Sequence, residues 1–226
     1  MLKQVFKFSV VAIIAVSCTG NSEVSDVETT IDTSDSQETP VVESVEVSDT
    51  IIGGGLTIYP FTESVPFADP KLGLLKPQDG DEHAKEKVAF EFSVENYTLG
   101  EQTPGAVDNG LANSGKGQHI HLIMDNDPYS AHYTPSFEKE LGAGQHIGLA
   151  FLSRSYHESV KNLEAFKVFQ VAIGSEAAKL ETVDLSQPLL FYSRPKGEYK
   201  GEGTKKVLFD FYLVNTDLES HGYKVV

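Results

Sequence analysis

The chain has 226 residues, of which 40% are hydrophobic, 23% charged and 10% aromatic, a composition typical of soluble globular proteins. Its 18 Lys and Arg residues against 33 Asp and Glu give a formal net charge of −15, which argues against a nucleic-acid partner because duplex binders need clustered cations. The single Cys, Cys18, excludes an internal disulfide, a zinc site built from several thiolates and a Cys-x-x-Cys redox centre.

Residues 1–17 have the layout of a bacterial lipoprotein signal peptide. Lys3 and Lys7 precede an apolar run that is too short to span a bilayer, and small residues then lead to Cys18. The segment Ala15-Val16-Ser17-Cys18 resembles a lipobox, with Ala15 where the commonest pattern has Leu. This resemblance implies cleavage before Cys18 and attachment of acyl chains such as palmitate, which would hold the protein on a membrane. An ordinary cleaved signal with an incidental Cys is the alternative.

Residues 18–50 are predicted to form a disordered acidic tether behind the lipidated Cys. From Thr19 to Thr50 there are nine acids, twelve Ser and Thr, no Lys or Arg and no aromatic residue. Such a segment cannot bury enough apolar surface to offset its chain entropy, and its like charges extend it. Residues 51–69 are then a lead-in segment to the folded part.

After residue 51 the hydrophobic pattern has a period of two, which predicts β-strands. Val88, Phe90, Phe92 and Val94, for example, alternate with less apolar residues. Similar runs occur at 72–77, 118–126, 137–141, 145–152, 166–174, 189–193, 207–215 and 223–226. Helical spacing is sustained nowhere except briefly near 156–166. The strand count and turn spacing predict an all-β fold, with an immunoglobulin-like antiparallel β-sandwich over residues 70–175.

The strand phenylalanines are expected to lie in the core, because large aromatic side chains are usually buried. They are Phe90, Phe92, Phe151, Phe169, Phe209 and Phe211.

Residues 185–226 are predicted to be a partial second repeat of the sandwich. The segments 90–99 and 209–218 share the pattern Phe-acid-Phe-x-aliphatic-x-Asn-x-x-Leu, and Pro77 and Pro195 stand at matching places upstream. Two or three strands alone leave an open edge and an uncovered apolar face. The favoured interpretation is a truncated repeat. The alternatives are that these strands dock on the first sandwich or on a second copy, or that the likeness is accidental.

The candidate chemistry lies in the histidines between positions 119 and 157. Alternation along residues 118–125 puts Ile120, Leu122 and Met124 on the core face, with His119 and His121 together on an exposed outer face. In residues 145–152 we expect the large residues to face the core and the small ones to leave the outer face bare. Those small residues are Gly148 and Ala150, which follow His146.

Antiparallel pairing of these two strands would bring the β-strand histidines near the loop 153–158. The predicted metal ligands are His119, His121, His157 and Glu158, a set suited to Zn(II) or Cu(II). The neighbouring residues that could instead bind an anionic ligand are Arg154, Tyr156 and Lys161. At the opposite end a secondary cluster would gather Asp125, Asp127, His132 and His146. A purely structural role for the histidine pair stays open.

Three segments carry a resemblance to known proteins. Residues 117–125, the turn 141–146 and the pair Tyr156-His157 look like small periplasmic sandwich domains related to the copper-resistance copper carriers. The chain, tether included, is also similar to envelope lipoproteins of the Bacteroidetes type labelled phosphopeptide-binding, and this likeness covers about residues 70–226. The chain departs from true copper carriers in having only Met1 and Met124, so a thioether Cu(I) site is excluded.

The function expected from these patterns is binding. No Gly-x-x-x-x-Gly-Lys loop, His-Glu-x-x-His helix or Gly-x-Ser-x-Gly elbow is present, so we expect a protein that is not an enzyme, although a catalytic carboxylate pair stays open. We expect a lipid-anchored protein of the cell envelope, in the outer membrane, that binds Cu(II) or Zn(II). The alternative is a recognition or adhesion module for a peptide, a glycan or another envelope protein.

Overall fold

The computed structural model describes residues 50–52, 56–58, 61, 64–174 and 183–216. The predicted signal peptide, Cys18, most of the tether and the expected strand 223–226 lie outside these residues. The chain divides into two compact units, and in the smaller one, Phe8–Ser64, strands β1 (Thr50–Ile52) and β2 (Leu56–Ile58) pair antiparallel. The larger unit contains Val65–Val226 and carries everything described below. Among the described residues, no helix is both long enough and apolar enough to cross a membrane.

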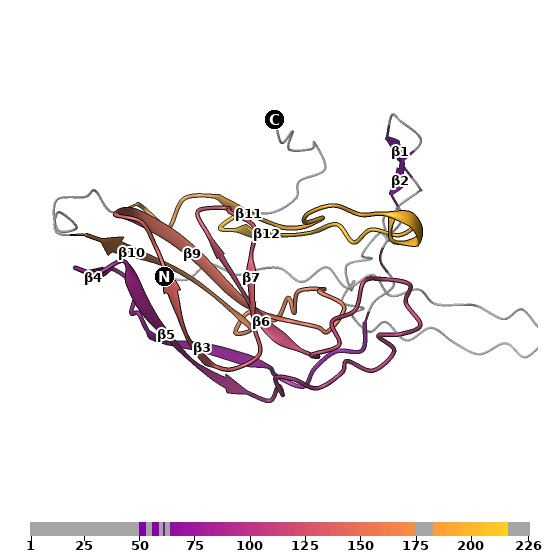
Figure 1. The fold of residues 1–226 in the computed structure, drawn as a ribbon, viewed down its shortest axis with the longest axis horizontal. Coiled ribbons are helices and arrows are strands. Elements are labelled where there is room, and N and C mark those ends of the chain that lie inside the picture. Colours follow the sequence, from indigo (N-terminus) through magenta and orange to yellow (C-terminus); the bar gives the residue numbers. More distant parts are fainter. Residues whose placement is uncertain (1–49, 53–55, 59–60, 62–63, 175–182, 217–226) are drawn as a thin grey trace, which may run out of the picture. The chain divides into compact units, whose positions relative to one another are not determined.

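The larger unit is built from strands, so the all-β prediction is confirmed (Figure 1). One sheet has the order β3-β5-β8, from β3 (Lys71–Lys76), β5 (Lys87–Glu95) and β8 (Ser136–Glu140). A second sheet has the order β4-β10-β9-β6-β7, from β4 (Asp81–His83), β6 (His119–Met124), β7 (Ser130–His132), β9 (Gly144–Ser153) and β10 (Phe166–Ile173). Their neighbouring strands run antiparallel except for the parallel pair β10 and β4.

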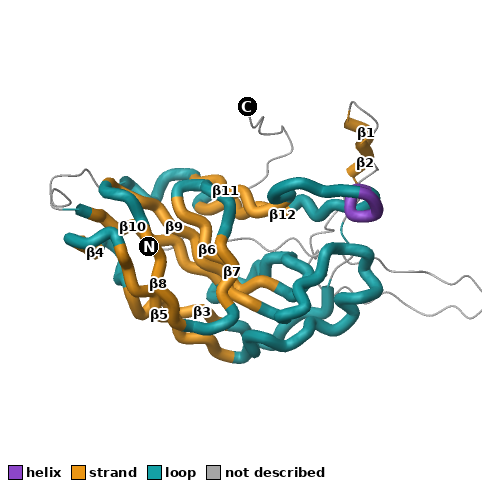
Figure 2. The backbone as a smooth tube through the Cα atoms, viewed as in Figure 1, coloured by secondary structure: helices purple, strands orange, loops and turns teal. Residues whose placement is uncertain are grey.

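The main core lies between these two sheets, because each contributes one apolar face to it. Phe90 on β5 stacks on Phe137 with ring centres 5.4 Å apart, and its edge meets Phe169 of β10 at 6.1 Å. Ile120, Leu122 and Met124 of β6 face this core as predicted. Figure 2 shows that the long segment between β5 and β6 is loop rather than regular structure.

Strand β9 faces the opposite way from the prediction. Ala150 and Leu152 belong to the core between the sheets, whereas Leu149 and Phe151 lie on the outer face. Gly148 stands opposite Phe169 in the register, and a Cβ at this glycine would lie 2.3 Å from the Phe169 ring. The small residues of β9 therefore make room for large side chains of the neighbouring sheet and strand. They do not form a bare outer surface.

A hairpin covers the outer face of the five-stranded sheet. Strands β11 (Leu189–Arg194) and β12 (Asp210–Val214) pair antiparallel, and the single helical turn η2 (Gly201–Thr204) lies in the connection between them. Phe191 and Tyr212 of the hairpin share a second apolar cluster with Leu149 and Phe151 of β9. These strands thus dock on the first pair of sheets, which is one of the alternatives left open by the sequence. The interpretation as a truncated repeat stays a prediction.

The hairpin repeats the geometry of β3 and β5. The β3–β5 register shifts between Leu74 and Lys76, and the β11–β12 register shifts between Tyr192 and Arg194. After the shift Lys76 pairs with Glu91, and Arg194 pairs with Asp210. These are the positions that the sequence comparison aligned, so the likeness extends to the backbone pairing of the two hairpins.

One predicted core residue is exposed in this second hairpin. Phe209 is 60% exposed, whereas its counterpart Phe90 is fully buried. Phe90 is covered by Phe137 of the third strand β8 and by Phe169, while the described sheet of the hairpin has only two strands. Without a third strand, Phe209 contacts its own hairpin neighbours Tyr192 and Phe211 at the surface.

Candidate metal centre

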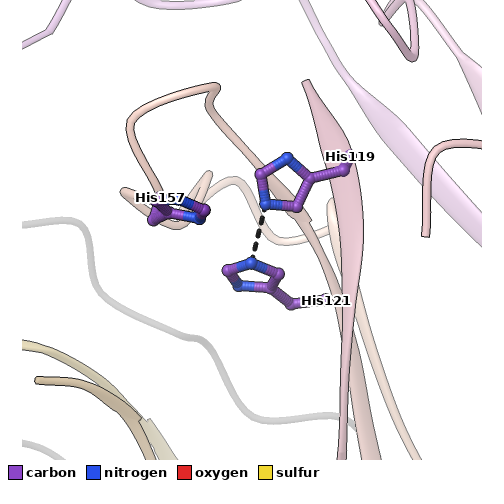
Figure 3. Close-up of side chains that lie close together, drawn as sticks. All are labelled: His119, His121 and His157. Carbon is purple, nitrogen blue, oxygen red and sulfur yellow. Dashed lines mark hydrogen bonds between the residues drawn. The ribbon is translucent and has the colours of Figure 1, made fainter. Parts of the chain in front are cut away.

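Three histidines meet on the outer face of the five-stranded sheet. His119 and His121 come from β6, and His157 comes from the loop that follows β9 (Figure 3). One ligand atom from each lies within 4.8 Å of the others. The prediction that His119 and His121 are exposed is wrong, since both are fully buried. Their outer face is covered because Tyr129 and the loop of His157 pack over it.

The loop that carries His157 is held by its own backbone. His157 donates its N–H to the Arg154 carbonyl at 2.8 Å, and Arg154 donates to the Glu158 carbonyl at 2.9 Å. His157 has a φ of 69°, in the left-handed region that non-glycine residues seldom adopt. This turn directs its imidazole toward β6, where its ring centre lies 5.0 Å from that of His119 and 5.6 Å from that of His121.

The hydrogen bonds of the cluster indicate which ring nitrogens carry a proton and which have a free lone pair. His119 Nδ1 lies 2.8 Å from the Gly117 carbonyl, which can only accept, so this nitrogen carries the proton and Nε2 has a lone pair. That Nε2 lies 2.7 Å from His121 Nε2. Within the described part of the chain, His121 Nδ1 and His157 Nδ1 are buried without a hydrogen-bond partner. Such orphaned polar atoms are uncommon in folded proteins.

Aromatic side chains wall the cluster. The His121 ring stacks on Tyr129, with ring centres 3.6 Å apart, and meets the edge of Phe151 at 5.1 Å. Tyr133 lies beside His119, with ring centres 5.0 Å apart. Because these rings exclude water from two of the three imidazoles, the cluster has a low local dielectric.

This environment keeps the three imidazoles neutral. Burial lowers the pKa of His119, and it lowers that of His121 well below the usual 6.5. Burial, reinforced by the charge of Arg194, lowers the pKa of His157 to about 3. A neutral imidazole is the form that binds a metal ion, so none of the three residues has to lose a charge to act as a ligand at neutral pH.

The geometry suits a three-histidine metal site. Zinc–nitrogen bonds of about 2.0–2.1 Å place neighbouring tetrahedral ligands roughly 3.3 Å apart. The three ligand atoms lie within 4.8 Å of one another, a separation of the same order. The bond from His119 to the Gly117 carbonyl is the kind of outer contact that fixes the tautomer of a ligating histidine.

Glu158 lies outside this group of ligand atoms. Its carboxylate forms an ion pair with Arg154 Nε at 3.1 Å. The prediction that Glu158 is a fourth ligand is therefore wrong, because its carboxylate is engaged by the guanidinium four residues before it. Within the described residues, the cluster therefore contains three imidazoles and no carboxylate.

The residues predicted to bind an anion are already engaged. Arg154 is 6% exposed, donates to the Val65 carbonyl at 2.8 Å and lies over the Phe67 ring. Lys161 pairs with Asp210 at 3.0 Å. Tyr156 is buried and lines a cavity of about 230 Å³. Arg154 and Lys161 thus hold a loop and the hairpin in place, whereas Tyr156 faces the cavity.

Only part of the predicted secondary cluster comes together. His146 Nδ1 lies 2.6 Å from the Asp125 carboxylate, and its Nε2 lies 2.8 Å from the Gly142 carbonyl. His132 instead contacts the Ser130 hydroxyl at 2.8 Å and stacks on Phe137. In the described part of the chain, neither Asp127 nor His132 joins Asp125 and His146 in a group of potential ligands.

The histidines should titrate in a distinctive order in the metal-free protein. Burial opposes the charged form of His146, but its bonds to Asp125 and Gly142 outweigh burial and raise its pKa above 6.5. Burial lowers the pKa of His132 to about 4. We expect imidazole proton shifts followed by NMR to show His146 titrating above pH 6.5, with His132 and His157 still neutral at pH 5.5. Charged His157 at pH 5.5 would contradict the burial described here.

Sequence reasoning missed four residues around the centre. Tyr129 and Tyr133 flank the histidines, and Arg194 and Lys196 reach Tyr129 from the hairpin. Tyr129 and Tyr133 follow the Asp127-Pro128 turn, which is a signal for a loop but not for a site. The two cations belong to a segment that was assigned to a separate repeat, so nothing in the sequence placed them here.

Comparison with known proteins does not extend this picture. No family model, no curated protein and no solved structure matches the chain.

Proposed function

We propose that this protein binds one divalent transition-metal ion, Cu(II) or Zn(II), through His119, His121 and His157. The observation that carries the proposal is the convergence of three neutral imidazoles whose ligand atoms lie within 4.8 Å of one another. Two of their nitrogens are buried without a partner among the described residues.

A purely structural role explains the cluster less well. Structural histidines in a core usually find hydrogen-bond partners for both ring nitrogens. His146 does so through Asp125 and Gly142, but His121 and His157 each keep an unpartnered Nδ1 among the described residues. The cluster is therefore better matched to a ligand than to the hydrogen-bonding needs of the fold.

The ligand set favours nitrogen-binding metals. Imidazole suits Zn(II) and Cu(II), and at equal availability such a site binds Cu(II) more tightly than Zn(II). Three histidines leave a fourth coordination position for water or another ligand. We keep the expectation of binding without catalysis, although three-histidine sites of this kind also occur in enzymes.

The test is metal content and affinity in the full chain, purified without an affinity His tag. We expect one equivalent of zinc or copper in elemental analysis, and a His157→Ala variant that binds it roughly 100-fold or more weakly in calorimetric titration. His157 is suitable because it is on a loop and only partly buried. His132→Ala is the matched control, since His132 is also partly buried but lies outside the centre. Equal affinity in wild type and His157→Ala would refute the proposal.

A peptide or glycan module without metal is the competing function. Its predicted surface on β9 would have included Gly148 and Ala150. Ala150 belongs to the core between the sheets, and the outer face of β9 is packed against the hairpin. This competing function would be supported by a protein that neither contains nor takes up metal.

We also infer the setting of the protein from its sequence. The facing sheets support an immunoglobulin-like β-sandwich, with the parallel β4–β10 pair as a departure from it. The lipobox-like segment supports a lipoprotein anchored through Cys18 in the outer membrane, of the Bacteroidetes-type group to which the chain is similar. Mass spectrometry of the mature N-terminus tests the anchor, because an acylated Cys18 adds the mass of its fatty-acid chains and Cys18→Ser abolishes it.

A further inference from the structure

The surroundings of the three histidines are positively charged, although the chain as a whole carries −15. Arg194 donates to the Tyr129 hydroxyl, and the Tyr129 ring stacks on His121. Lys196 donates to the Tyr129 carbonyl, and its Nζ lies 3.9 Å from the centre of the same ring. Arg194 at the end of β11 and Lys196 in the connection that follows thus both contact the ring that stacks on the candidate ligand His121.

These cations have neutral partners. Arg194 also donates to the Tyr199 hydroxyl at 3.0 Å, and its buried Nε has no hydrogen-bond partner among the described residues. Asp210 is opposite Arg194 in the register, but its carboxylate pairs with Lys161 at 3.0 Å. In the part of the chain that the structure describes, no carboxylate forms an ion pair with Arg194 or Lys196.

A metal ion would add charge to this already positive region. Three neutral imidazoles do nothing to offset the +2 of a divalent ion. Buried charge is costly unless an opposite charge compensates it. Water in the fourth position would leave the whole charge in place, whereas an anion bound to the metal would reduce it and would also be attracted by Arg194 and Lys196.

We propose that the metal in this centre takes a small anion, such as a carboxylate, as its fourth ligand, held by the positive charge of Arg194 and Lys196. This inference rests on the proposed metal binding.

The experiment uses the full chain loaded with one equivalent of Cu(II), in a perchlorate medium of fixed ionic strength. Azide is the probe, because its binding to Cu(II) produces a charge-transfer absorption band. We expect the band to saturate at one azide per copper and acetate to displace azide. Lys196→Gln should weaken azide binding about three- to tenfold, since it removes one nearby positive charge. Lys200→Gln is the matched control, because Lys200 is on the same connection with a side chain that is 77% exposed, and it should leave azide affinity unchanged.

The possible results separate this inference from the metal proposal. Copper held by the three histidines without an azide band would overturn the anion ligand and leave the metal site intact. Equal azide affinity in wild type and Lys196→Gln would show that the hairpin cations do not hold the anion, which also overturns the inference. Failure to bind Cu(II) at all would refute the metal proposal itself, and the anion ligand with it.

Discussion

Acid should destabilise the metal-free protein steeply between pH 6.5 and pH 4. His119 and His121 are fully buried, and burial lowers the pKa of both below 6.5. In the unfolded chain both would titrate near 6.5. Below that pH the unfolded chain therefore binds protons that the folded protein does not bind. The free energy of unfolding falls as the pH falls.

The size of this effect follows from the number of protons. Each proton bound only by the unfolded chain lowers the free energy of unfolding by up to about 1.4 kcal/mol per pH unit. His119 and His121 together give up to about 2.8 kcal/mol per unit, against a typical total stability of about 5–15 kcal/mol. His157, whose pKa is lowered to about 3, adds to this slope, whereas His146, whose pKa is raised, changes stability mainly above pH 6.5.

Urea unfolding of the full chain at a series of pH values measures the slope directly. We expect wild type to lose stability from pH 6.5 downward. His157→Gln should lose less stability per pH unit, because it removes one histidine that is protonated only in the unfolded chain. His146→Gln is the contrasting variant. The raised pKa of His146 contributes stability that is present below pH 6.5 and is lost as the pH rises through its folded value, so its removal should lower stability by a nearly constant amount below pH 6.5 and leave the acid slope nearly unchanged. A stability that is flat from pH 6.5 to pH 4.5 would contradict the buried neutral histidines.

Adding a methyl group at Gly148 should cost about 3 kcal/mol or more of stability. A Cβ at this position would lie 2.3 Å from Phe169 Cζ and 2.7 Å from both Cε atoms of the ring. Phe169 is 1% exposed and packs against Phe90, so its ring has no free space into which it can move. The strand or the ring must shift, and either movement disrupts the core between the two sheets.

The comparison is between Gly148→Ala and Gly142→Ala in the full chain. A Cβ at Gly142 meets no atom within 4 Å, so this control changes the same chemical group without a clash. Urea unfolding should show a large loss for the first variant and a change within about 0.5 kcal/mol for the second. Replacing the ring with the smaller leucine side chain, in a Gly148→Ala, Phe169→Leu double variant, should recover part of the lost stability. Equal stability of the two alanine variants would disprove the packing described for β9.

Local alternation predicted the strands well but could not say which face of a strand is covered, or by what. On β6 it correctly put Ile120 and Leu122 on one face and His119 and His121 on the other. On β9 it assigned the faces the wrong way round. A period of two separates the faces of a strand but does not label them, and here both faces are buried. The reversal at Gly148 became visible only through Phe169 on the neighbouring strand.

The sequence predicted only part of the candidate site. His119, His121 and His157 were grouped from strand pairing alone, and the structure brings their ligand atoms together. The fourth predicted ligand, Glu158, instead pairs with Arg154 four residues before it, because a side chain at that spacing is within reach of a guanidinium. The tyrosines and cations around the centre were not predicted, since their contacts join segments that are far apart in the chain.

The sequence by itself determined the all-β class, the strand positions and the types of residue that could bind a metal, because these depend on periodicity and side-chain chemistry within a few neighbouring residues. Only the tertiary structure decided that the histidines are buried, neutral and surrounded by positive charge. Those properties arise when the β11–β12 hairpin and the loop of His157 pack over β6. Burial and electrostatic environment are set by such long-range contacts, and a single strand does not encode them.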